Sequence, residues 1–104
     1  MVKFMAIYYW PQEGEKFDEE YYKTKHLPMA KKELKGAVGV TYCNVQPTEE
    51  GGNPNVKGIG VVSWEDMNSF QKDMASPARN KLMADIPNFA SCKMDFLGVV
   101  EEEI

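Results

Sequence analysis

The chain contains a single histidine, His26, within a segment whose residues suit proton transfer. Imidazole has an ordinary pKa between pH 5 and 8, which makes His26 the first candidate for an acid or base. Tyr22 lies four residues earlier, and on a helix this spacing places both side chains on one face. Pro28 lacks a backbone donor and frees the carbonyl of Thr24, so we expect the helix to kink or end there. We therefore predict a site with His26 and Tyr22 as catalytic residues.

Both residues also have a structural interpretation. His26 could cap carbonyl groups that Pro28 leaves without a donor. Tyr22 is spaced from Phe17 as the partner in a hydrophobic staple around Asp18, a good N-cap. Asp18 could in addition accept a hydrogen bond from the Tyr22 hydroxyl. The sequence leaves these alternatives open.

The other reactive groups form no recognisable centre. Cys43 and Cys92 are far apart and lack a CxxC pairing, so we expect two inert buried thiols. With one histidine, they cannot complete a zinc site within one subunit. The sequence also lacks a glycine-rich phosphate loop, a GxSxG elbow and a paired-carboxylate site. We therefore predict no metal and no cofactor.

Length and charge limit the class of protein. A chain of 104 residues corresponds to one domain, residues 1–104. A formal net charge of −4 disfavours nucleic acid or an anionic membrane as the partner. No signal peptide, transmembrane run or lipidation motif is recognisable, so we expect a cytoplasmic location.

The hydrophobic pattern predicts strands and helices in the order β-α-β-β-α-β. The first helix starts at Asp18 and ends near Gly36. The second begins with a capping box formed by Ser63 and Asp66 and restarts at Ser76. Residues 46–55 have the composition of an exposed, flexible loop. The four predicted strands are Val2–Trp10, Ala37–Val45, Val56–Trp64 and Ser91–Val100.

This order predicts an α+β fold, the ferredoxin-like sandwich of an antiparallel sheet with both helices on one face. The first strand is nevertheless apolar on both faces once past Lys3. Two sheets packed face to face would cover the second face and enclose a cavity, since a large exposed apolar face is rare on a soluble monomer. We therefore predict a homodimer, a dimeric α/β barrel.

Side chains on the first and third strands suggest a ligand pocket. Gly58 and Gly60 alternate along one face and let another group approach closely. One alternation set of the strand aromatics could line an apolar pocket for a planar ligand, while the other set forms core. For two further candidates, Tyr21 and Phe89, packing is the alternative. The predicted ligand-binding residues are Tyr9, Trp10, Tyr21, Trp64 and Phe89.

Two stretches resemble a known family. The run Phe17-Asp18-x-x-Tyr21-Tyr22-x-x-x-His26-x-Pro28-Met29 is similar to the signature of the EthD-like proteins of the dimeric α/β-barrel superfamily. The segment LMADIPNF at 82–89 resembles the family's segment before the last strand. The resemblance implies a ferredoxin-like dimer. It also implies an oxidoreductase-type enzyme or degradation accessory protein, often labelled "EthD family reductase".

Three functions are compatible with the sequence. The first is a small enzyme acting on an apolar or aromatic molecule, with His26 as acid or base at the mouth of the cavity and an oxidoreductase or isomerase-like reaction without a cofactor. The second is a non-catalytic protein that binds the same class of ligand. The third is a haem binder with His26 as axial ligand.

Overall fold

The computed structural model describes residues 1–48 and 55–104, so most of the predicted loop over 46–55 lies outside the described residues. The elements follow one another in the predicted alternation of strands and helices. Their bounds are β1 Val2–Tyr9, α1 Glu19–Tyr21, η1 Tyr22–His26, α2 Leu27–Glu33, β2 Gly39–Asn44, β3 Val56–Trp64, α3 Met67–Met74, α4 Pro77–Asp85, η2 Ile86–Asn88 and β4 Met94–Val100.

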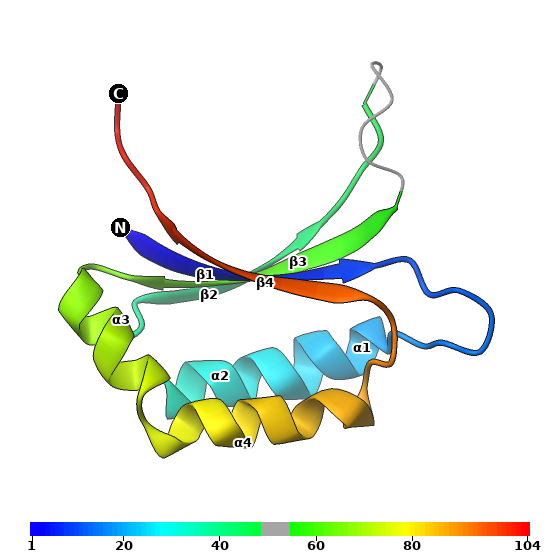
Figure 1. Ribbon diagram of the computed structural model, residues 1–104, viewed down its shortest axis with the longest axis horizontal. Coiled ribbons are helices and arrows are strands. Elements are labelled where there is room, and N and C mark those ends of the chain that lie inside the picture. The colour runs from blue at the N-terminus through cyan, green and yellow to red at the C-terminus, as the bar shows by residue number, and fades with distance from the viewer. Residues whose placement is uncertain (49–54) are drawn as a thin grey trace.

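The sheet has four strands in the order β2-β3-β1-β4, and every neighbouring pair is antiparallel. The helices lie together on one face, while the ends of the strands curve away from them (Figure 1). This arrangement confirms the predicted α+β, ferredoxin-like fold. The third strand has the predicted bounds; the others are shorter than predicted, and β4 begins at Met94 instead of Ser91.

The first helical segment begins as predicted but does not end at Pro28. The Asp18 side chain accepts a hydrogen bond from the backbone N–H of Tyr21 at 3.0 Å, so Asp18 is the N-cap. The next turn, η1, is a π-helix in which the N–H of Leu27 donates to the carbonyl of Tyr22. Pro28 then lies in the first turn of α2, where the backbone N–H that proline lacks is not needed for a hydrogen bond within that helix. The helix therefore accommodates the proline after a widened turn and continues to Glu33.

The second helical segment corrects one prediction and confirms another. Its N-cap is Asp66, whose carboxylate accepts from the N–H of Ser69 at 2.8 Å. Ser63 lies inside β3 and caps nothing, because the strand continues to Trp64. Ser76 caps α4 as predicted, with Pro77 in the first position.

The core between the sheet and the helices depends on the two glycines of β3. Gly58 and Gly60 both face the helices, as their register with Tyr8 and Ala6 shows. The side chain of Tyr42 occupies the space that a Cβ at Gly58 would need, and the hydroxyl of Tyr22 does the same at Gly60. The groups that approach these two glycines closely are therefore tyrosine side chains of the same chain.

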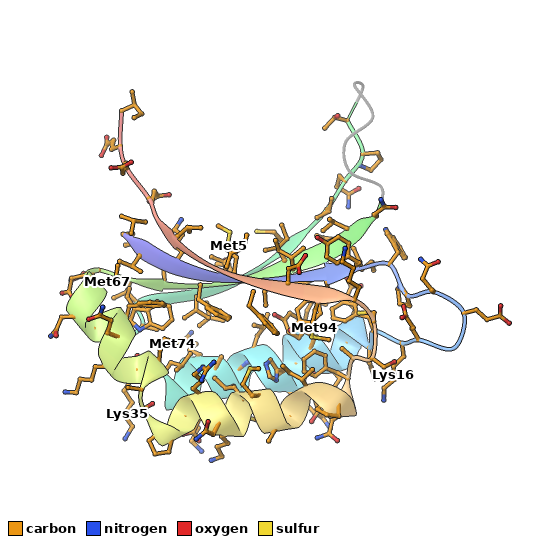
Figure 2. All side chains as sticks on the ribbon, viewed as in Figure 1. Met5, Lys16, Lys35, Met67, Met74 and Met94 are labelled. Carbon is orange, nitrogen blue, oxygen red and sulfur yellow. The ribbon has the colours of Figure 1, made fainter. Side chains whose placement is uncertain are left out.

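The other face of the sheet is apolar and no helix of the described residues lies over it. Met5 points away from the helices, whereas Met74 and Met94 lie on the helix side (Figure 2). Strand register places further apolar side chains beside Met5 on this open face, and Leu97 is 45% exposed. The side chains that we call the open face are Met5, Ile7, Ile59, Val61, Leu97 and Val99.

We expect Gly60→Ala to lower the free energy of unfolding by about 1–3 kcal/mol, because the new methyl group collides with the Tyr22 hydroxyl in a packed core. Gly39→Ala is the control, since no atom lies within 4 Å of its Cβ position. We expect its free energy of unfolding to change by less than about 0.5 kcal/mol. Urea denaturation measures both, and equal losses would contradict the packing of Tyr22 against Gly60.

Candidate functional site

His26 lies between the helices and the sheet, at the end of the π-helical turn η1. It is only 7% exposed. The ring stacks on Tyr22 with centroids 5.4 Å apart and contacts Phe89 at 4.6 Å. The four-residue spacing therefore brings His26 and Tyr22 together as predicted. Single π turns occur frequently at functional sites, and here the turn carries the only imidazole of the chain.

The imidazole is held by a carboxylate from the second helical segment. Nδ1 of His26 lies 2.8 Å from Oδ2 of Asp85, the last residue of α4. The same carboxylate accepts from the Tyr21 hydroxyl at 2.8 Å and from Nδ2 of Asn88 at 2.9 Å. Asp85 thus connects α1, η1 and η2 through three hydrogen bonds, which fix the plane of the His26 ring.

Burial and hydrogen bonding set the charges of this pair. Burial lowers the pKa of His26, and the hydrogen bond and charge of Asp85 raise it only in part. Burial alone would raise the pKa of Asp85, but its three donors, Asn88, His26 and Tyr21, hold that pKa below its usual value. At neutral pH, Asp85 is therefore a carboxylate and His26 a neutral imidazole whose Nδ1–H donates to it.

The second ring nitrogen of His26 is left with its lone pair available. Nε2 has no hydrogen-bond partner among the described residues, while every fully buried side-chain nitrogen or oxygen among them has one. Nε2 therefore lies where solvent or a ligand can reach it. A neutral imidazole held through Nδ1 with Nε2 free is the arrangement of a general base.

Tyr22 packs against the His26 ring in the core. It is fully buried, and its ring also contacts Tyr8 with centroids 4.8 Å apart. Burial, followed by the influence of Tyr8, raises the pKa of Tyr22 far above its usual value. Burial also raises the pKa of Tyr8, to about 12. Both hydroxyls therefore remain protonated at neutral pH and act as hydrogen-bonding groups.

The His26 ring borders an apolar cavity of about 60 Å³, here called the inner cavity. It lies on the helix side of the sheet. The predicted location at the mouth of a cavity between two sheets is therefore corrected. The first helix packs against the helix-facing side of β3, which draws His26 away from the open face. Besides His26 and Tyr22, the walls include Ala6, Gly60, Leu82 and Ile86.

A second apolar cavity of about 100 Å³, here called the outer cavity, adjoins the first. The two share four lining side chains, which places the cavities next to each other. Of these, Phe4 and Phe96 come from the sheet and stack with centroids 5.8 Å apart. The shared residues are Phe4, Leu82, Met83 and Phe96.

Two of the predicted ligand-binding aromatics join the His26 cluster. Tyr21 belongs to the Asp85 network, and its ring stacks on Phe89 with centroids 6.0 Å apart. Phe89 is fully buried and contacts both Tyr22 and His26. Neither residue lines the inner cavity directly. Phe89 contacts two residues that do, and Tyr21 packs on Phe89.

The structure does not bring the other three aromatics to His26. Trp64 is fully buried in a separate part of the core, and its Nε1 donates to Asp73 at 2.7 Å. Tyr9 faces away from the helices, because alternation in β1 puts Tyr8 on the helix side. Its hydroxyl donates to Asp95. Trp10 is 49% exposed and lies under the Lys57 ammonium.

The cysteines do not compete with His26. Cys92 is buried, and burial raises the pKa of its thiol, which makes the thiolate scarce. Cys43 is exposed on β2, which corrects the prediction that both thiols are buried, because it faces the uncovered side of the sheet. Among the described residues, no group of three or more His, Cys, Asp or Glu side chains could hold a metal ion.

Sequence reasoning missed Asp85, the residue that holds His26. A signal was present, because Asp85 is the only acid in the apolar stretch 82–89 that resembles the family segment. Its partner is 59 residues away in the chain, and no periodicity connects the two.

The fold and site define an α+β ferredoxin-like domain with an apolar pocket on its helix side. No protein-family model matches the chain, and no curated protein sequence matches it. Among solved structures, it is similar to an EthD family protein from Bacillus halodurans, with 19% identity over 98% of this chain and 99% of that one and a TM-score of 0.78. It is also similar to an EthD-like protein from Ralstonia eutropha, with 22% identity over 97% and 95% of the two chains and a TM-score of 0.73.

A third neighbour is SnoaB, a cofactor-independent oxygenase from Streptomyces nogalater, with 12% identity over 99% and 94% of the two chains and a TM-score of 0.61. At these identities the similarity establishes the fold. Both EthD neighbours share the ferredoxin-like fold that the resemblance to the EthD-like proteins implied. No helix of the described residues has the length and apolarity needed to cross a membrane.

We expect the single imidazole to titrate below pH 6.5 in an NMR titration, because burial disfavours its charged form. Its contribution to stability is then complete above about pH 6.5 and is lost as the pH falls below that value, since the unfolded chain binds the proton more readily. Asp85→Asn removes the group that raises this pKa, so the midpoint should fall further. An unchanged or higher midpoint in the variant would contradict the pairing.

Proposed function

We propose that the protein is an EthD-like small-molecule enzyme in which His26 transfers a proton to and from a small apolar or aromatic ligand. The supporting observation is the neutral imidazole that Asp85 holds through Nδ1 while Nε2 stays accessible beside an apolar cavity. The reaction needs no metal and no cofactor. The proposal keeps the predicted role of His26 and adds Asp85 as the residue that positions it.

The proposed step is abstraction of a proton from a C–H or O–H group of the ligand. The lone pair on Nε2 takes the proton, the electron pair stays on the ligand as an enolate or phenolate, and the new imidazolium is stabilised by the Asp85 carboxylate. The proton then returns to the same ligand at another atom, which is an isomerisation. An oxidation without a cofactor would begin with the same step, followed by reaction of the anion with dioxygen. Proton abstraction is therefore common to both reaction types that the resemblance implies.

The cavities favour a small ligand over haem. Haem would need Nε2 as its axial ligand, and that nitrogen is available. The inner and outer cavities have volumes of about 60 and 100 Å³, whereas pockets for drug-sized or cofactor-sized molecules have roughly 300–1,000 Å³. The residues present do not fit a macrocycle, and we do not propose haem binding.

We also propose that the protein is a homodimer that covers the open face. This face is apolar at its centre, and no helix of the described residues lies over it. Packing two such faces together removes both from water, and obligate interfaces of this kind bury upwards of roughly 2,000 Å². The second copy would thus cover the side of the sheet opposite to His26 and leave the inner cavity to each subunit.

Sedimentation should show a dimer at micromolar concentration, and Leu97→Glu should shift it to monomer and lower its stability, because a charge is placed on the open face. Met67→Glu is the matched control, since Met67 is also exposed but lies on α3. A folded wild-type monomer at this concentration would overturn the dimer.

The proton transfer can be tested with a nitrobenzisoxazole probe, whose ring C–H loses a proton while its N–O bond breaks to give a coloured cyanophenolate. We expect the wild-type protein to accelerate this reaction, with a rate that rises with pH through one ionisation below pH 6.5, because the neutral form of His26 is the base. His26→Gln keeps the size and hydrogen bonding and should lower the rate by about 10²–10⁴-fold.

Cys43→Ser is the control for this experiment and should leave the rate unchanged. If His26→Gln keeps the full rate, His26 is not the base. If the wild-type protein binds the probe without accelerating its reaction, it is a non-catalytic protein that binds ligands in this pocket. That is the second of the functions compatible with the sequence.

A further inference from the structure

Arg79 is the only arginine in the chain, and it borders the outer cavity. The other lining residues of this cavity are apolar: Phe4, Leu34, Met74, Leu82, Met83 and Phe96. A guanidinium carries five N–H donors and remains charged at every physiological pH. The Arg79 guanidinium is therefore a permanent cation at the edge of an apolar cavity. The proposed proton transfer assigns it no role.

The Arg79 side chain has no carboxylate partner among the described residues. Their ion pairs join Lys3 to Glu101, His26 to Asp85, Lys57 to Glu19 and Lys81 to Glu33. Lys81 lies two residues after Arg79 on the same helix and is paired with Glu33 at 2.7 Å. Within α4, one basic side chain is therefore paired inside the protein and the other is available to a ligand.

Arg79 and the pair of His26 and Asp85 lie at opposite ends of one stripe along α4. Arg79, Leu82, Met83 and Ile86 follow the helical spacing of three, four and seven residues, and each lines one or both cavities. At 1.5 Å per residue, Arg79 and Ile86 are separated by about 10 Å along the helix axis. Asp85, next to Ile86, holds His26. The inner and outer cavities thus extend in sequence from His26 to Arg79.

Two of the four side chains that the cavities share are exposed and can change rotamer. Met83 is unbranched and 41% exposed, and Phe96 is also exposed at the edge of the sheet. Rotation of these two side chains needs no change in the backbone. It would join the inner and outer cavities into one slot between α4 and the sheet.

We propose that this slot binds an elongated amphipathic anion whose carboxylate pairs with Arg79 and whose reactive C–H or O–H group lies at Nε2 of His26. The apolar walls suit an aliphatic or aromatic body, whose length would be on the order of the 10 Å that separates Arg79 from Ile86 along the helix axis. A planar guanidinium matches a carboxylate with two parallel hydrogen bonds, which fixes the direction in which the ligand enters. This inference rests on the proposed function and adds to it the substrate class, an apolar carboxylic acid.

The test compares two probes of equal length and different charge, 4-phenylbutyrate and 4-phenylbutanol, by isothermal titration calorimetry at pH 7.5. We expect the wild-type protein to bind the carboxylate at least about tenfold more tightly than the alcohol. This difference in affinity corresponds to the contribution of one hydrogen bond between charged groups. Arg79→Gln should abolish this preference while binding of the alcohol stays the same. Arg79→Lys keeps the charge without the planar fork and should retain part of the preference.

Lys81→Gln is the matched control, because it removes one positive charge from the same helix at a position paired with Glu33. It should leave the preference for the carboxylate intact. Equal or undetectable binding of the two probes by the wild-type protein would overturn the inference. So would an equal loss of preference in Lys81→Gln and Arg79→Gln, which would reflect net charge alone.

The NMR signal of the single imidazole separates this inference from the proposed function. 4-Phenylbutyrate could shift that signal in the wild-type protein while Arg79→Gln keeps the preference for the carboxylate. Arg79 then does not bind the carboxylate and this inference fails, whereas the proposed role of His26 is unaffected. If the preference depends on Arg79 but His26→Gln keeps the full rate with the nitrobenzisoxazole probe, Arg79 binds the carboxylate and His26 is not the base.

Discussion

The buried carboxylate of Asp85 is the interaction on which the arrangement of this protein's site depends. A carboxylate that is withdrawn from water is costly unless its oxygens are hydrogen-bonded, and here three donors satisfy it. The donors come from α1, η1 and η2, so the carboxylate joins the first helical segment to the end of the last. Any shift of one helix against the other would leave a buried charge without partners. The pair therefore fixes both the packing of the two helical segments and the orientation of the His26 ring.

The sheet provides a different chemical environment on each of its faces. On the helix side, the absence of side chains at Gly58 and Gly60 lets Tyr42 and Tyr22 reach the backbone of β3. The helices can then pack closely, and a small apolar cavity remains beside His26. On the open face, the apolar side chains have no cover within the described chain. One face thus carries helices with small apolar cavities beneath them, and the other presents an apolar surface.

The π-helical turn links the local sequence to the site. Proline in the interior of an α-helix would collide with the preceding turn and remove a hydrogen bond. Here the turn from Tyr22 to His26 is widened, and Pro28 lies in the first turn of the helix that follows. His26 is the last residue of that widened turn and contacts Asp85 at the end of α4. An irregular turn just before the proline thereby coincides with the position of the only imidazole in the chain.

Much of the fold was predictable from the sequence because its signals are local. Alternation of apolar residues located the strands, Asp18 and Ser76 marked helix starts, and the order of elements indicated a ferredoxin-like sheet. The same local patterns brought His26 and Tyr22 to one helix face. Ser63 was assigned to a cap because serine before an acid fits that pattern, whereas pairing with its neighbours kept it in β3.

The sequence by itself determined which residue can move a proton, because one imidazole is a matter of composition. Only the tertiary structure decided that Asp85 holds it, that Trp64 and Tyr9 lie elsewhere, and that the cavity is on the helix side of the sheet. The physical reason is that these facts depend on how two helices pack on a sheet. Packing joins residues as far apart as His26 and Asp85, and no periodicity along the chain records such a contact.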